Sequence, residues 1–405
     1  MIPRLKPYLG KEEFSALFHP YGGSVQSFEE KFAKTFGVKH ALSFPYGRSA
    51  LWAFFKAMQI RGEEIVQPAY TCSVVAHATV LSENDPVFVD NNLTDYNMDD
   101  DLLAQAITAR TRVVIPTHIF GYPMDAARVN AIVRDAEKRF GQRIYVIQDC
   151  AHSFDAQSQE KSVIQSGDGA LFGLGISKQI TSIFGGMFTT DDDEIAERMR
   201  TWRARNFKTA DWGRNVARAL YLLAIYPAFN ETLYGLVYWL QEKTPVLNRL
   251  TKAYHLDEKI HFPPDFQILM SNVEASVGLA QLDKYVEIQK TRRAIAERYF
   301  GELTPPETWI MPPKIDGATY SHYPIRVPDN RKIMDYAAGK GVQFGQLIEY
   351  SIPHLAAYSA YKGEREFSNS LYCSQHMINL PIHPGLKPEQ IDQIISIVNA
   401  YQAAG

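Results

Sequence analysis

Residues 144–152 of this 405-residue chain read Ile-Tyr-Val-Ile-Gln-Asp-Cys-Ala-His, and this stretch decides the fold. It begins with apolar residues and ends on the carboxylate of Asp149 and the imidazole of His152. A short apolar run of this kind predicts a strand buried within a parallel sheet. Because open α/β sheets hold ligands at the carboxyl ends of their strands, we expect Asp149 to face a binding site.

A second motif places a lysine after another strand-like run. Residues 170–178 read Ala-Leu-Phe-Gly-Leu-Gly-Ile-Ser-Lys, and a tight Phe-Gly-Gly-Met turn follows at 184–187. Taken singly, Asp149 would be a strand-end cap and Lys178 a solvated loop residue. Together they are the two groups that pyridoxal phosphate requires. A lysine forms the Schiff base, and an acid keeps the pyridinium nitrogen protonated.

The phosphate of such a cofactor needs backbone amides at a helix start. Residues 46–51 read Tyr-Gly-Arg-Ser-Ala-Leu, and apolar residues at helical spacing follow them. This pattern predicts a helix whose amino end holds the phosphate with Gly47, Arg48 and Ser49. Arg48 would add a cationic contact. The alternative is an ordinary helix that begins at a glycine.

Several motifs, in this order along the chain, resemble the DegT/DnrJ/EryC1/StrS family of pyridoxal phosphate-dependent sugar aminotransferases. The matching segments lie at 64–71, 86–99, 113–125, 148–156, 172–178 and 184–192. The resemblance extends from about Phe28 to about Ala400. Any one motif would be weak evidence, whereas their common order makes the resemblance specific.

The resemblance implies the type I aminotransferase fold, with a doubly wound, mostly parallel sheet and a smaller C-terminal α+β domain. It implies transfer of an amino group from a donor such as glutamate to a keto sugar or another carrier-linked carbonyl compound. It also implies a homodimer. In this scheme Lys178 forms the Schiff base, Asp149 pairs with the pyridinium nitrogen, and His152 lies beside the phenolic oxygen of the cofactor.

Two cofactor positions depart from the family pattern. Gly173 stands where the family usually has a serine that contacts the phosphate, and we expect Ser177 to take over this contact. Cys72 stands where an aromatic residue usually covers the pyridine ring. Tyr70 either stacks on the ring instead or packs in the core.

A further departure lies at residues 266–271, Phe-Gln-Ile-Leu-Met-Ser. Family members often have an asparagine here that reaches the partner subunit's phosphate, and Gln267 can donate the same kind of hydrogen bond. Leu269 replaces an arginine and cannot donate. The missing donor weakens the prediction that the substrate is a nucleotide sugar. It weakens the prediction of aminotransferase activity less.

Two alternatives to an aminotransferase stay open. The cofactor shell does not fix the reaction, so a pyridoxal phosphate enzyme of another reaction type is one of them. The other is a regulatory or scaffold protein that binds the cofactor without turnover. Lys178 argues against the branch of the family that dehydrates sugars, because that branch has a histidine in its place.

The composition is that of a globular enzyme. The chain has 46% hydrophobic residues and a net charge of −3. This charge gives no indication of the basic surface that nucleic-acid binding requires. Its three cysteines lack CxxC spacing, so neither a disulfide framework nor a structural zinc site is predicted, and no other metal site is expected. The amino-terminal residues lack the apolar core of a secretory signal, and we expect a cytoplasmic location.

The order of predicted elements indicates two domains. Strands alternate with helices up to about residue 205, and a boundary is predicted near Pro263 and Pro264. We therefore expect a large pyridoxal phosphate-binding domain at 1–262 and a small domain at 263–405.

Residues 216–240 form an apolar, aromatic insertion in the large domain. Pro227, Asn230 and Glu231 interrupt it, which favours two short helices over one membrane-spanning helix. One prediction is a buried helical hairpin. The other is peripheral membrane contact, with tyrosines at the membrane boundary and two nearby arginines, Arg214 and Arg218, at lipid headgroups.

Overall fold

The computed structural model describes residues 1–18, 24–230, 234–235, 238, 240 and 259–401, and a seven-stranded sheet forms its centre. In spatial order the strands are β1 (His40–Phe44), β9 (Gly186–Thr190), β8 (Gly169–Gly173), β5 (Tyr145–Asp149), β4 (Thr111–Val114), β2 (Glu64–Pro68) and β3 (Asp85–Val89). Neighbours from β8 to β3 are parallel, and β9 is antiparallel to both β8 and β1. The mostly parallel α/β sheet predicted from the sequence is confirmed.

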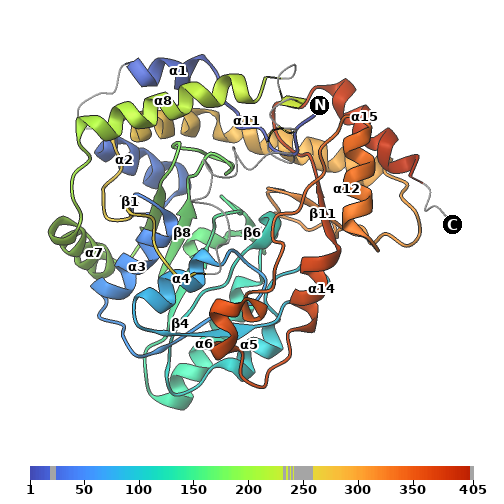
Figure 1. Ribbon diagram of the computed structural model, residues 1–405. Helices are drawn as coiled ribbons and strands as arrows, with labels where there is room; N and C mark the ends of the chain where they lie inside the picture. Colours follow the sequence, from blue (N-terminus) through green and yellow to red (C-terminus); the bar gives the residue numbers. More distant parts are fainter. Residues whose placement is uncertain (19–23, 231–233, 236–237, 239, 241–258, 402–405) are drawn as a thin grey trace.

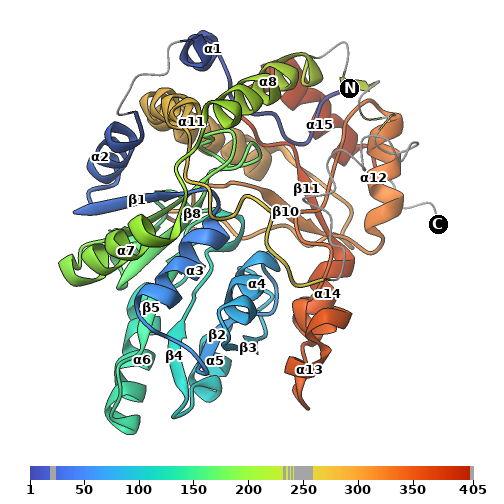
Figure 2. The same ribbon diagram turned by 60° about the vertical axis from the view of Figure 1, so that its left-hand side comes forward.

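Helices cover both faces of this sheet (Figure 2). They are α2 (Ser24–Phe36), α3 (Gly47–Ala57), α4 (Val74–Leu81), α5 (Asp100–Ala106), α6 (Ala126–Phe140), α7 (Asp193–Asn206) and α11 (Asn272–Glu302). On β8, Ala170 and Phe172 pack on the side of α2 and α11, whereas Leu171 packs on the side of α3 and α7. Successive side chains of a strand point to opposite faces of the sheet, so a run that is apolar throughout packs against the helices on both faces.

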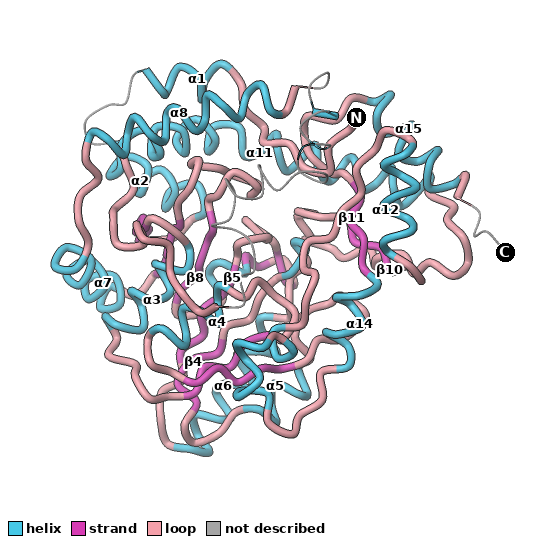
Figure 3. The backbone as a smooth tube through the Cα atoms, in the orientation of Figure 1, coloured by secondary structure: helices cyan, strands magenta, loops and turns pink. Residues whose placement is uncertain are grey.

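The remaining C-terminal elements form a smaller unit beside the main sheet. Figure 3 shows β10 (Tyr323–Arg326) and β11 (Met377–Leu380) apart from the strands of that sheet, and the two strands pair with each other in an antiparallel manner. Their helices are α12 (Asn330–Gly339), α13 (Ser359–Lys362), α14 (Ser368–His376) and α15 (Pro388–Asn399). Two further short strands, β6 (Gln157–Ser158) and β7 (Lys161–Ser162), pair near the main sheet.

Packing joins the two units more closely than the predicted boundary near residue 263 suggests. The first half of α11 packs on the large unit through Leu282 and Tyr285, and its last turns pack on the small unit through Ile295 and Tyr299. At the other end of the chain, Ile2 pairs with Val342 of the small unit. The division at residues 262 and 263 stays a prediction.

The apolar insertion begins with a helix that lies along one edge of the molecule. Helix α8 (Trp212–Ala228) runs beside α11 and α1 (Lys11–Phe18), as Figures 1 and 2 show. It includes Pro227 in its last turn and ends at the next residue. None of the helices in the described ranges has both the length and the apolar character needed to cross a bilayer. Residues 231–233, 236–237 and 239 of the insertion lie outside the described residues.

Candidate active site

A cavity of about 680 Å³ lies where the carboxyl ends of the sheet strands meet the small unit. It is lined by Arg4, Tyr46, Gly47, Arg48, Leu51, Thr71, Cys72, Val74, Val75, Asp149, Ala151, His152, Leu171, Gly173, Gly175, Ser177, Lys178, Phe184, Gly185, Gln346, Leu347, Ile348, Glu349 and Tyr350. The structure therefore brings together seven of the predicted site residues, namely Gly47, Arg48, Cys72, Asp149, His152, Ser177 and Lys178.

Lys178 lies in the loop between β8 and β9, and its Nζ is 3.2 Å from Nε2 of His152. Desolvation lowers the pKa of this lysine, although the charges of Cys72 and Asp149 oppose the shift. A lowered pKa makes the neutral, nucleophilic amine more accessible. A side chain at Gly173 would place its Cβ 3.2 Å from Cε of Lys178, so the lysine side chain would have to shift by a few tenths of an ångström.

Asp149 ends β5 with its carboxylate turned toward the cavity. The amide of Ala151 donates to its Oδ1 at 3.1 Å, and the hydroxyl of Thr117 donates to its Oδ2 at 3.4 Å. Burial raises the pKa of Asp149 in spite of these hydrogen bonds and the nearby Lys178. In the described part of the chain no arginine or lysine forms an ion pair with Asp149. A cationic ring nitrogen fits this buried acid.

His152 lies between Lys178 and a second histidine. The rings of His152 and His322 are 5.4 Å apart, and both line the space around Lys178. Desolvation, followed by the charges of Lys178 and His322, keeps the pKa of His152 well below its usual range. The imidazole is therefore neutral at pH 7, and its Nε2 can accept a hydrogen bond from the ammonium of Lys178.

The amino end of α3 has the features expected of the predicted phosphate site. Gly47 and Arg48 line the cavity, and Tyr46 at the N-cap provides no side-chain hydrogen bond to the first turn. The free amides and the helix dipole together favour an anion at this end. A Cβ on Gly186 would lie 2.3 Å from the amide nitrogen of Gly47, so the adjacent β9 strand must begin with glycine. One cavity therefore contains a helix amino end, a lysine and a buried acid, which are the groups that pyridoxal phosphate would need.

The structure corrects two of the predicted cofactor contacts. Ser49 is fully buried, and its hydroxyl donates to the carbonyl of Phe266 at 2.8 Å instead of lining the cavity. Tyr70 is 1% exposed and packs in the core with Phe120, where its hydroxyl donates to the carbonyl of Ile348. Stacking of Tyr70 on the cofactor ring is therefore wrong, and its alternative role in packing is correct.

Gln267 also lies away from the cavity. Its side-chain amide donates to the carbonyl of Asn206 at 3.3 Å. Contact with a partner subunit's cofactor stays a prediction, because the structure contains a single chain.

Some cavity residues were missed in the sequence analysis because they come from distant segments. Arg4 reaches the cavity from the amino end of the chain, where its guanidinium donates to the carbonyl of Gln346. Tyr350 lines the cavity from the small unit, and its hydroxyl accepts a hydrogen bond from the amide of Ser73 at 3.0 Å. The phenyl and phenol rings that line the cavity belong to Tyr46, Phe184 and Tyr350.

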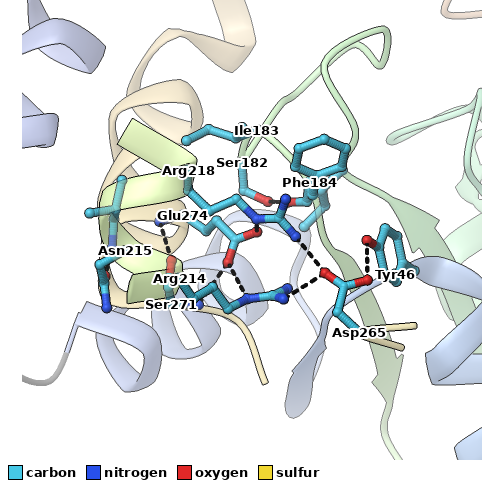
Figure 4. A network of polar contacts seen from close by, with 12 residues as sticks. Tyr46, Ser182, Ile183, Phe184, Arg214, Asn215, Arg218, Asp265, Ser271 and Glu274 are labelled. Atoms are coloured by element: carbon cyan, nitrogen blue, oxygen red, sulfur yellow. Dashed lines mark hydrogen bonds and ion pairs between the residues drawn. The ribbon is translucent and has the colours of Figure 1, made fainter. Parts of the chain in front are cut away.

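A buried polar network anchors α8 to the wall of the cavity (Figure 4). Asp265 pairs with Arg214 at 2.7 Å and with Arg218 at 2.9 Å, and Glu274 pairs with Arg218 at 2.9 Å. The arginine side chains are 8% and 14% exposed, and Glu274 is fully buried. The predicted contact of these arginines with lipid headgroups is therefore wrong, since the carboxylates already hold both of them inside the protein.

This network also positions two aromatic residues of the cavity. The hydroxyl of Tyr46 donates to Asp265 at 2.8 Å, and the guanidinium of Arg218 lies 4.1 Å from the ring centre of Phe184. Tyr221 of α8 packs on the same phenylalanine, with the two ring centres 4.9 Å apart. Part of the apolar insertion thus supports the cavity wall.

Comparisons with known proteins agree with this geometry. A sequence model of the DegT/DnrJ/EryC1/StrS aminotransferase family matches residues 14–399. The spore coat polysaccharide biosynthesis protein SpsC of Bacillus subtilis is 25% identical over 98% of this chain and 96% of its own. The dTDP-3-amino-3,6-dideoxy-alpha-D-galactopyranose transaminase of Aneurinibacillus thermoaerophilus is 27% identical over 94% of this chain and 90% of its own. The sugar aminotransferase CalS13 from Micromonospora echinospora shares the fold, with a TM-score of 0.78 at 18% identity, covering 99% of this chain and all of that one.

Proposed function

Because this chain belongs to the DegT/DnrJ/EryC1/StrS aminotransferase family, it is a pyridoxal phosphate-dependent aminotransferase, and we propose that its acceptor is a keto sugar or another carbonyl compound joined to a carrier group. The amino donor in this proposal is an amino acid such as glutamate. The observation that carries the proposal is the meeting of Lys178, Asp149 and the open amino end of α3 in one cavity. Among the relatives, the name of the Aneurinibacillus transaminase specifies a dTDP-linked amino sugar.

The cofactor, when bound, supplies a ring that stabilises negative charge at the reacting carbon. Asp149 provides the buried negative charge that favours a protonated ring nitrogen. Gly47 and Arg48 would hold the phosphate at the helix amino end, where the amides and the guanidinium would complement its charge.

Lys178 is the proton carrier in this proposal. Its amine would accept the proton from the substrate carbon at Nζ and would later give it up again. The lowered pKa of Lys178 favours the neutral form needed for the first of these steps. His152 positions the amine, because its neutral ring accepts a hydrogen bond from Nζ at 3.2 Å.

The enzyme acts as a homodimer in this proposal, as the family resemblance implies. Four large apolar side chains on α1 and α8 support an association surface, namely Phe14, Phe18, Trp212 and Leu220, which are 45%, 59%, 80% and 61% exposed. Large exposed apolar side chains on two neighbouring helices favour protein contacts. The helix edge is also where peripheral membrane contact would occur. Light scattering tests the dimer and liposome flotation tests the membrane alternative, with a cytoplasmic protein expected to stay out of the floating fraction.

A single-turnover assay tests the proposed reaction. The purified protein, loaded with pyridoxal phosphate, is mixed with L-glutamate, and we expect one equivalent of 2-oxoglutarate and of pyridoxamine phosphate per active site. Bound cofactor without any amino transfer, across a panel of amino donors, would instead support the regulatory or scaffold alternative. A product other than the oxo acid would indicate another reaction type.

A further inference from the structure

A second cavity, of about 100 Å³, adjoins the candidate active site. His152 and Lys178 line both cavities, so a small molecule at the lysine can extend into the second one. A water molecule occupies about 30 Å³ in the liquid, so this space holds a carboxylate or a small oxyanion but not a sugar nucleotide.

The most informative residue in its wall is Arg292, on α11. It is 3% exposed, and its Nη1 donates to the carbonyls of Ser321 at 3.1 Å and Ile382 at 2.6 Å. Its Nε has no hydrogen-bond partner. Burial lowers the pKa of Arg292 to about 10, and the group that opposes this shift is the phenol of Tyr285, not a carboxylate. A buried guanidinium therefore retains an unused donor.

Asn379, on β11, provides a second unused donor. Its Oδ1 accepts a hydrogen bond from the amide of Leu347 at 2.9 Å, which fixes the orientation of the side-chain amide. The Nδ2 group then has no partner, although the residue is only 2% exposed. Buried donors without partners are rare in folded proteins, and two that line one cavity indicate a missing acceptor.

The charges around this cavity are almost all positive. Arg4, Lys178 and Arg292 line it together with three histidines, and none of its lining residues, all of which the structure describes, is an aspartate or a glutamate. Asp149 and Glu349 line the larger cavity and not this one. An anion entering the smaller cavity would meet the guanidinium groups of Arg4 and Arg292 and would pair the unused donors.

We propose that this smaller cavity binds the carboxylate of the amino donor, with Arg292 and Asn379 as the residues that hold it. The inference rests on the proposed aminotransferase function. An amino acid has its carboxylate one carbon from its amino group, so a donor whose amine reacts at the position of Lys178 brings its carboxylate into the adjoining space. A phosphate of the acceptor is the competing source of an anion.

Direct binding tests the inference without turnover. Glutarate, a dicarboxylate that cannot react because it has no amino group, is titrated into the cofactor-loaded protein by calorimetry. Arg292→Met should weaken glutarate binding about tenfold or more, since charge-assisted hydrogen bonds are among the strongest in proteins. Arg293→Met is the matched control, because Arg293 is the adjacent, exposed arginine on the same helix, and its binding should equal the wild type.

Asn379→Asp provides a second test if loss of the bonds from Arg292 to the two carbonyls disturbs folding. It keeps the acceptor for Leu347 but replaces the unused donor with a negative charge, so glutarate binding should be lost. Equal glutarate binding by wild type and both variants, or no binding by the wild type, would overturn the inference. Binding of inorganic phosphate that depends on Arg292 and is not displaced by glutarate would assign the cavity to the acceptor instead.

The selectivity for the amino donor tests this inference independently of the proposed function. The ratio of kcat/KM for L-alanine to that for L-alaninamide should fall in Asn379→Asp, because only the amino acid has a carboxylate. An unchanged ratio would contradict the inference and leave the aminotransferase intact. If the wild type transfers no amino group at all, the proposed function fails, and the glutarate titration still reports on the cavity.

Discussion

Asp149→Asn should leave the fold intact and remove most of the activity. The carboxylate accepts hydrogen bonds from the amide of Ala151 at 3.1 Å and from the hydroxyl of Thr117 at 3.4 Å. An asparagine keeps an oxygen for the amide, and the hydroxyl can rotate to accept from its NH₂ group. Burial raises the pKa of Asp149, which means that the site disfavours a charged side chain. A neutral asparagine therefore costs no extra desolvation. We expect the free energy of unfolding to change by no more than about 1 kcal/mol.

The effect on catalysis follows from the lost charge. An adjacent opposite charge shifts a pKa by about 1 to 3 units, so without it the protonated fraction of the cofactor nitrogen falls about ten- to a thousandfold at neutral pH. Turnover should fall by the same factor while the cofactor stays bound. Steady-state kcat, with cofactor content measured after denaturation, gives the comparison.

Asp168→Asn is the control for this variant. Asp168 directly precedes β8, accepts a hydrogen bond from the amide of Val146 at 2.7 Å and pairs with Arg143 outside the cavity. Its replacement should alter stability but not kcat. Turnover near the wild-type value in Asp149→Asn would show that Asp149 is only a strand-end cap, and the argument from the buried charge would be refuted.

Three further predictions concern the lysine and the α8 network. Lys178→Ala should abolish covalent attachment of the cofactor, measured by borohydride reduction and mass spectrometry; a labelled peptide in this variant would assign the attachment to another lysine. In the protein without cofactor, Lys178→Met should raise the melting temperature at pH 7, because desolvation lowers the pKa of the lysine and the buried ammonium destabilises the fold. This gain should shrink as the pH rises from the lowered pKa toward the usual lysine value, 10.5, since deprotonation then relieves the cost in the wild type; a gain that is constant with pH would contradict it. Glu274→Gln should destabilise the protein by about 3 to 5 kcal/mol, measured by urea unfolding, because it leaves Arg218 and Arg214 short of a buried partner. A change below about 1 kcal/mol would mean that the network contributes little.

The sequence by itself determined the sheet and the central chemistry. The apolar run before Asp149 predicted a buried parallel strand, and residues 145–149 form β5 at the centre of the sheet. Residues 272–302 form the single long helix α11, whose buried apolar residues recur at helical spacing. These features depend on periodicity and on residues close in the chain, which a sequence displays directly. The family resemblance added the cofactor, and the family match confirms it.

Positions near a motif were less well predicted than the motifs themselves. Tyr70 and Cys72 both follow β2, yet Cys72 lines the cavity and Tyr70 packs in the core. In the same way Gly47 and Arg48 face the cavity, whereas Ser49 turns to the carbonyl of Phe266. Which way a side chain points after a strand end or in a first helical turn depends on the elements packed against it.

Only the tertiary structure decided which distant residues complete the site. Arg4 and Tyr350 are separated by most of the chain, and they reach one cavity because the amino end pairs with the small unit through Ile2 and Val342. The same packing places Arg292 of α11 against Asn379 and His152 around the second cavity. The spacing of residues in the sequence does not predict these contacts. They depend on how the two units pack on one long helix, and not on the local conformational preference of each residue.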